Sequence, residues 1–145
     1  MKTLRAFLLF LFLPALCFAQ GAKKIPVKVG HDGNDQVGKS VVFALKEAIR
    51  GSQSFFLVED LKRPAISVTL LSVDVDDPDK GIRSSMTVIV VYDSMTTPGA
   101  GIFLNAVGLM CGRNIAERCA KDILPIIDRG VQFLRTNQPD LWKQL

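Results

Sequence analysis

Residues 65–93 read AISVTLLSVDVDDPDKGIRSSMTVIVVYD, and this stretch decides the fold. Its two arms, residues 65–75 and 83–93, are rich in Val, Ile and Thr, which favour β-strands. The segment between them contains DDPDKG, and Asp, Pro and Gly favour turns. The stretch therefore predicts two long antiparallel strands joined as a hairpin.

The residues before this hairpin predict two further strands. Residues 24–30 alternate apolar and polar side chains, as a half-buried strand does. Pro26 lacks the N–H group for a sheet hydrogen bond, so this strand is expected to begin there or to lie at the sheet edge. A polar loop is expected over residues 31–36, and a short strand over residues 55–60.

A helix is expected between these two strands. Apolar residues recur at helical spacing over residues 37–50, and most charged side chains lie outside the apolar stripe. Asp35 is placed to cap the first free backbone amides. Gly51 suits a left-handed residue just after the helix end.

The carboxy-terminal part predicts one more strand, over residues 102–110, and a second helix. Asn114 followed by Glu117 resembles a capping box with Asn in place of Ser or Thr, and the apolar stripe continues to about residue 135. The predicted order is therefore β-α-β-β-β-β-α. We expect an α+β fold with a mixed, mostly antiparallel sheet of about five strands and two helices on one face, because each helix has a single apolar stripe.

The first twenty residues, MKTLRAFLLFLFLPALCFAQ, have a positive start, an apolar run and smaller residues, as a secretory signal peptide does. The run is shorter than the roughly 20 residues that a membrane-spanning helix needs. Cleavage is expected after Ala19, so residues 1–19 form the signal peptide and residues 20–145 a single α+β domain. A lipoprotein acylated at Cys17 is the alternative, but Leu16 is bulky for the position before an acylated cysteine. We expect a periplasmic or secreted protein with no membrane span in its mature chain.

The charge of the mature chain excludes one class of partner. Cleavage would remove Lys2 and Arg5, so 16 basic residues would remain against 14 acidic ones, a net charge of +2. Binding of a nucleic acid needs several Lys or Arg side chains gathered on one face, and here they are scattered along the chain. We expect no nucleic-acid partner.

Two cysteines would remain after cleavage, Cys111 and Cys119, and an oxidising compartment makes them a candidate disulfide. In one straight helix their Cα atoms would lie about 12 Å apart, beyond the limit of roughly 7 Å for a bridge. The bond therefore requires a chain reversal, which the turn at Gly112 and Arg113 between strand and helix would provide. Two buried free thiols remain the alternative.

Residues 33–40, GNDQVGKS, satisfy the phosphate-loop pattern G-x-x-x-x-G-K-[ST], with Gly33, Gly38, Lys39 and Ser40 at its fixed positions. A strand before it and a helix after it fit a loop whose backbone amides bind phosphate. Export argues against this function, because the leader directs the chain away from the cytoplasmic nucleotides. The consecutive strands also differ from the parallel sheets of nucleotide hydrolases. We interpret the segment as a turn into a capped helix, with nucleotide or phosphate binding as the alternative.

Apart from the phosphate-loop match, no pattern in the sequence indicates a catalytic centre, a metal site or a cofactor. His31 is the only histidine, which excludes a histidine-based metal cluster, and it is interpreted as a loop residue. The spacing of Asp74, Asp76, Asp77 and Asp79 differs from that of a calcium-binding EF-hand, so these residues are interpreted as a solvated turn. We expect no enzymatic activity and no cofactor.

The run VVFALKEAIRGSQSFFLVED followed by AISVTLLSVDV resembles small α+β domains of bacterial envelope proteins, over roughly residues 37–93. Examples are the amino-terminal domain of the Tol translocation protein, the periplasmic domain of the curli secretion channel and lipoprotein activators of peptidoglycan synthases. The resemblance implies a non-catalytic protein-interaction module in the periplasm, with an envelope protein as its partner. The chain departs from these proteins because it has no convincing lipobox and because we expect no further strand or second domain after the last helix. No binding residues are carried over.

A free sheet edge is the expected site for such a partner. An extended segment of another protein can add a strand to an exposed edge through main-chain hydrogen bonds. The strand that contains Pro26 is the expected example.

Overall fold

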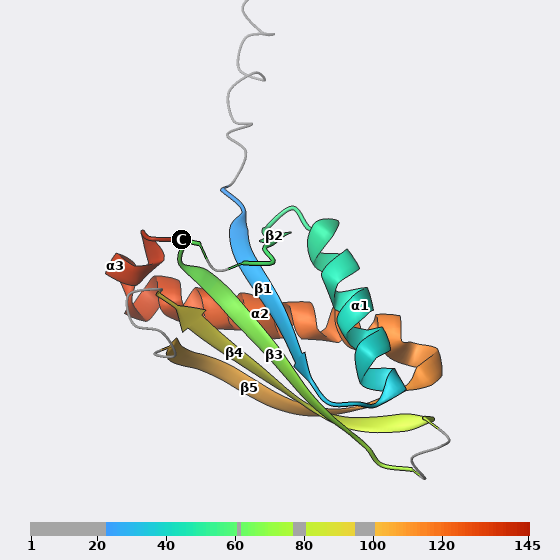
Figure 1. Ribbon diagram of the computed structural model, residues 1–145. Helices are drawn as coiled ribbons and strands as arrows, with labels where there is room; N and C mark the ends of the chain where they lie inside the picture. Colours follow the sequence, from blue (N-terminus) through green and yellow to red (C-terminus); the bar gives the residue numbers. More distant parts are fainter. Residues whose placement is uncertain (1–22, 61, 77–80, 95–100) are drawn as a thin grey trace, which may run out of the picture.

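The computed structural model describes residues 23–60, 62–76, 81–94 and 101–145 (Figure 1). The predicted signal peptide, residues 1–19, lies outside the described residues. The elements are β1 (Ile25–Asp32), α1 (Gln36–Arg50), β2 (Phe55–Leu57), β3 (Ala65–Asp74), β4 (Arg83–Asp93), β5 (Gly101–Gly112), the 3₁₀ turn η2 (Arg113–Ile115), α2 (Ala116–Asn137) and α3 (Pro139–Trp142).

The strands form one five-stranded sheet in the order β2-β1-β3-β4-β5. β1 runs parallel to both β2 and β3, whereas the longer β3–β4 and β4–β5 pairings are antiparallel. This arrangement confirms the mixed, mostly antiparallel α+β sheet. One expectation is wrong: the strand that contains Pro26 is not an edge strand, because α1 returns the chain to pair β2 on its outer side. Pro26 is instead the second residue of β1, near the strand start.

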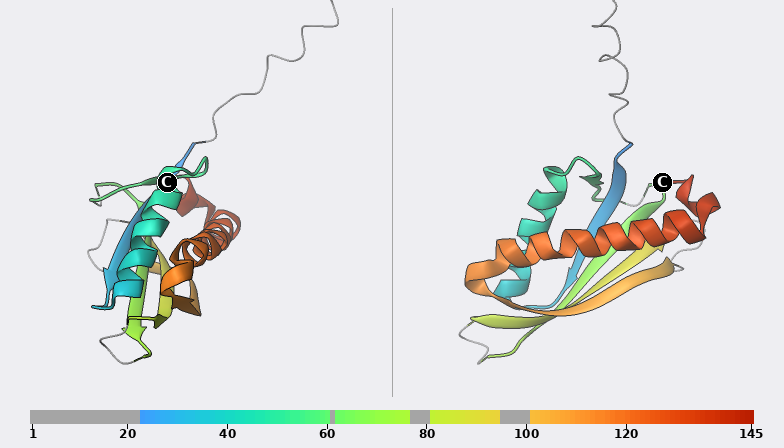
Figure 2. Two further views of the ribbon diagram at one scale, coloured as in Figure 1. Left: turned by 90° about the vertical axis from the view of Figure 1, so that its right-hand side faces the viewer. Right: turned by 180° about the vertical axis from the view of Figure 1, so that it is seen from behind.

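Both long helices lie on the same face of the sheet (Figure 2), as their single apolar stripes predict. Their stripes and the covered face of the strands form one core. Full burial of such an aliphatic or aromatic side chain contributes about 1.5–3 kcal/mol. The largest fully buried side chains include Tyr92, Leu45, Ile49, Ile66, Leu70, Met86, Ile123, Ile127 and Leu134. Within the described residues, no helix is both long enough and apolar enough to cross a membrane.

The helix ends confirm one predicted cap and correct two others. Asp35 is the N-cap of α1, as expected, and its side chain accepts a hydrogen bond from the Gly38 amide. Gly51 has φ −78° and is not left-handed; its amide instead closes the last turn by donating to the Glu47 carbonyl. The predicted capping box at Asn114 is wrong, because Asn114 lies in η2 and α2 begins after Ile115 with no side-chain cap.

Two strand boundaries also differ from the prediction. β1 continues through His31 and Asp32, because these residues still pair with β3. β5 continues to Gly112, which pairs with Arg83, so this strand is longer than its Asn and Gly content suggested. The loop between β1 and α1 is therefore reduced to residues 33–35.

Candidate functional site

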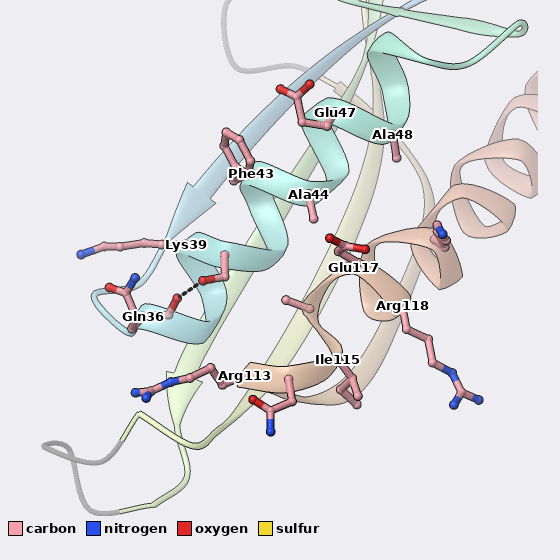
Figure 3. Close-up of a pocket in the computed structure, with 14 residues that line it drawn as sticks. Gln36, Lys39, Phe43, Ala44, Glu47, Ala48, Arg113, Ile115, Glu117 and Arg118 are labelled. Atoms are coloured by element: carbon pink, nitrogen blue, oxygen red, sulfur yellow. Dashed lines mark hydrogen bonds between the residues drawn. The ribbon is translucent and has the colours of Figure 1, made fainter.

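The phosphate-loop residues lie at the amino-terminal end of α1, where the chain already binds its own groups. The Asp35 carboxylate accepts a hydrogen bond of 2.6 Å from the Gly38 amide. The Ser40 hydroxyl donates to the Gln36 carbonyl at 2.9 Å, the dashed contact in Figure 3. Lys39 is exposed, and its ammonium forms no ion pair with the described residues. A bound anion would thus compete with Asp35 for the Gly38 amide.

A partly buried polar cluster surrounds the same carboxylate. The Ser84 hydroxyl donates to Asp35 Oδ1 at 2.5 Å, and the Ser72 hydroxyl donates to Asp35 Oδ2. His31 Nε2 lies 2.7 Å from Ser72 Oγ. The cluster therefore links β1, β3 and β4 to the first turn of α1, and it satisfies the two buried serine hydroxyls.

The structure corrects the interpretation of His31, which belongs to β1 and to this cluster rather than to a loop. In a serine hydrolase the imidazole lies between the serine and the carboxylate. Here the Ser72 hydroxyl lies between His31 and Asp35, and its proton is donated to the carboxylate. This order of groups holds the strands and the helix together, but does not activate the serine as a nucleophile.

The two glycines of the phosphate-loop pattern make room for this cluster. A Cβ atom at Gly38 would clash with Ser72 Oγ and would lie 2.7 Å from His31 Nε2. Gly33 has φ +151°, and a Cβ atom there would lie 2.5 Å from the Ser72 carbonyl oxygen. Only glycine fits both positions.

Hydrogen bonding sets the ionisation of Asp35. Burial by itself raises the pKa of this carboxyl, but the bonds donated by Ser72, Ser84 and the Gly38 amide outweigh burial and hold the pKa below its ordinary value of 3.8. Because the folded-state pKa is the lower one, the ionised group stabilises the fold above the ordinary value. That contribution is lost as the pH falls through the lowered pKa.

An Asp35→Asn variant tests this linkage. We expect the original chain to exceed the variant in free energy of unfolding at pH 7, because the amide nitrogen of Asn cannot accept the second serine hydrogen bond. We expect the difference to shrink at pH 3, below the ordinary value of 3.8, because the Asp35 carboxyl of the unfolded chain then takes up a proton. Urea unfolding at both pH values measures the difference in free energy of unfolding between the two chains. An equal difference at the two pH values would contradict an ionised Asp35.

A groove of about 1000 Å³ lies beside this cluster, between α1 and the η2–α2 segment (Figure 3). Phe43 and Ile115 are exposed large apolar residues of its lining, with exposed fractions of 67% and 47%. Ala44 of α1 points toward Glu117 of α2, whereas Phe43 points to the other side of α1, at the rim of the groove (Figure 3). The charged side chains of the lining are four cations and two acids: Lys39, Arg113, Arg118, Lys121, Glu47 and Glu117.

The cysteine pair fixes one wall of this groove. Cys111 of β5 and Cys119 of α2 have Cα atoms 6.2 Å apart, and their sulfur atoms lie at bonding distance. The chain reverses between them through η2, as the sequence predicts, although by a 3₁₀ turn. Since η2 supplies Arg113 and Ile115 to the groove, the bond holds this wall against α2. Arg113 is further held by its Nε, which donates to the Gly81 carbonyl at 3.0 Å.

Metal ligation finds no support in the described part of the chain, where no three His, Cys, Asp or Glu side chains gather to hold a metal ion. Asp77 and Asp79 of the acidic turn lie outside the described residues.

Comparisons with known proteins give only distant structural similarity. No protein-family model and no curated protein matches the chain. Among solved structures, the hypothetical protein CT253 from Chlamydia trachomatis is similar with a TM-score of 0.39 and 8% sequence identity. The match covers 77% of this chain and 95% of that chain.

Proposed function

We propose that the protein is an exported, non-catalytic binding module of the cell envelope, periplasmic or secreted, which holds a protein partner in the groove between α1 and η2–α2. The observation that carries this proposal is the exposure of Phe43 and Ile115 in that groove. Large exposed apolar residues along the lining of a groove are typical of interaction surfaces.

Export is supported by two features of the chain. The leader has the pattern of a signal peptide. The Cys111–Cys119 pair at bonding distance fits an oxidising compartment. Together with the resemblance to envelope domains, these features favour a partner in the same compartment.

The lining of the groove indicates the chemistry of the partner. Apolar side chains of the partner would cover Phe43 on α1 and Ile115 on η2, where they gain hydrophobic stabilisation. Because cations outnumber acids around the groove, a partner segment with acidic residues beside its apolar anchor fits best.

A photoreactive amino acid in place of Phe43 tests this site in intact cell envelopes. We expect crosslinking to one envelope protein from this position. Phe133 is the matched control, because it is also an exposed phenylalanine, on the α2 helix away from the groove lining. With the crosslinked partner purified, Phe43→Ala should weaken binding by roughly tenfold or more, as the loss of an interface anchor does. Equal crosslinking from Phe133 would argue against the groove.

The alternative function is nucleotide or phosphate binding through Gly33, Gly38, Lys39 and Ser40. We expect titration calorimetry with ATP, GTP and inorganic phosphate, each with Mg²⁺, to show no binding, because the Gly38 amide and the Ser40 hydroxyl already have partners within the chain. Binding that disappears in a Lys39→Ala variant would favour the alternative function.

A further inference from the structure

The outer edge of β5 lacks the prolines and charged side chains that usually protect a sheet edge. β5 spans twelve residues, GIFLNAVGLMCG, with no proline and no charged side chain. Figures 1 and 2 show it along one side of the sheet, with α2 on the covered face and no described segment beyond the strand. Edge strands in soluble proteins usually carry lysine, proline or a cover, because their free N–H and C=O groups pair readily with another strand.

The register identifies which backbone groups point outward. The Arg113 amide donates to the Ile82 carbonyl at 3.0 Å, so position 113 faces β4. Successive residues of a strand direct their N–H and C=O groups to alternate sides. Ala106, Gly108 and Met110 therefore direct these groups away from β4, toward the open edge.

These three residues suit pairing with their own copy. In an antiparallel pairing whose two-fold axis passes beside Gly108, this glycine lies opposite its counterpart, and Ala106 lies opposite Met110 of the second copy. Each outward N–H and C=O group then has a partner. On the uncovered face of the sheet, the large Met110 side chain, 58% exposed, meets the small Ala106. Gly108 has open space where its Cβ would be, so the central position causes no clash.

Charge also favours a second copy over a charged partner strand. Because β5 has no ionisable side chain other than its bridged cysteine, two-fold pairing brings no like charges together. A charged strand would find no opposite charge on this edge. The register shift between Val90 and Val91 ends the regular part of β5 near Asn105, which pairs with position 111 of the second copy and limits pairing to about residues 105–111.

We propose that a second copy of this chain binds antiparallel along β5, with the two-fold axis at Gly108, so that two sheets join into one. This self-association is separate from the partner site proposed in the helical groove, and it would stand if that site were wrong.

A charge placed on the axis tests the proposal. Gly108→Lys sets two ammonium groups against each other in the dimer. Thr87→Lys is the matched control, because Thr87 pairs with Gly108 and is exposed, but lies on β4, one strand in from the edge. Sedimentation equilibrium of the purified chain should show a dimer, with a dissociation constant raised at least about tenfold by Gly108→Lys. Thr87→Lys should leave the dissociation constant within about twofold of the original. Circular dichroism verifies that both variants fold.

A cysteine scan tests the register. In a hydrogen-bonded antiparallel pair the Cα atoms lie about 5.5 Å apart, so Gly108→Cys should form a disulfide-linked dimer. Ala106→Cys should not, because position 106 faces position 110 of the other copy.

Three outcomes would overturn the proposal. A chain that stays monomeric at all concentrations would do so, as would a dimer that is equally stable in Gly108→Lys and Thr87→Lys. A different protein that copurifies as a strand on β5 would overturn it as well.

Discussion

Replacement of Gly38 by alanine is expected to lower the free energy of unfolding by about 2–4 kcal/mol, through overpacking and disrupted buried hydrogen bonds. The new methyl group would occupy the position of Ser72 Oγ and approach His31 Nε2 at 2.7 Å. These side chains would have to move, and the bonds donated to the Asp35 carboxylate would lengthen or break. Urea unfolding at neutral pH measures the loss.

Two control variants separate this effect from a general effect of substitution. Gly108→Ala meets open space and should change stability by no more than about 0.5 kcal/mol. Lys39 is exposed, so Lys39→Ala should change the free energy of unfolding by a similarly small amount. If Gly38→Ala were as stable as these controls, the polar cluster would not hold the start of α1. If Lys39→Ala were the severe variant, the segment would depend on its lysine, as a phosphate loop does.

The strand pattern predicted the hairpin and the sheet class, but not the strand order. Alternation over residues 65–93 depends only on which face of each strand is buried, and that property is local. The neighbour of a strand depends on where the connecting helix returns the chain. α1 returns beside β1 and adds β2 there, so the Pro26 strand lies inside the sheet. No local property of Pro26 distinguishes a strand start from an edge.

The sequence contained a signal for the polar cluster, but the phosphate-loop pattern suggested a different role for the same segment. Alternation places Ser72 and Ser84 on the same face as their buried apolar neighbours, and a buried hydroxyl needs a partner. Asp35 was identified as a cap, which is confirmed, but its serine donors lie far along the chain and meet it only through the β3–β4 pairing. The glycines that match a phosphate loop are explained by this packing.

The groove was missed because it is formed by two helix ends that are distant in the sequence. Phe43 lies outside the apolar stripe of α1, so its exposure could be predicted, but a single exposed apolar residue does not by itself indicate a site. Ile115 was expected inside the second helix, yet it belongs to η2 and is exposed. A capping box at Asn114 would have made Ile115 the first residue of the helix. The chain forms a 3₁₀ turn there instead, and Ile115 is exposed in it.

Replacement of both Cys111 and Cys119 by serine is expected to destabilise the chain by about 2–3 kcal/mol, as the loss of a short disulfide loop does. The bond restricts the unfolded chain between β5 and α2, and the buried serine hydroxyls would add a cost of their own. Guanidinium unfolding of the purified chain measures the change. Thiol titration of the denatured, unreduced chain should find no free thiol, whereas two free thiols would establish the reduced pair that the sequence leaves open.

The same variant should also weaken partner binding in the groove, beyond its effect on stability. Without the bond, η2 loses its covalent link to α2, so Ile115 no longer has a fixed position in the groove lining. A Leu124→Ala variant is the control, because it removes apolar packing from α2 outside the groove lining and leaves the bond intact. If both variants lost stability but bound the partner equally well, the bond would serve the fold alone. If only the cysteine variant lost binding, export into an oxidising compartment would be a condition of the proposed function, because the groove would then be complete only after oxidation.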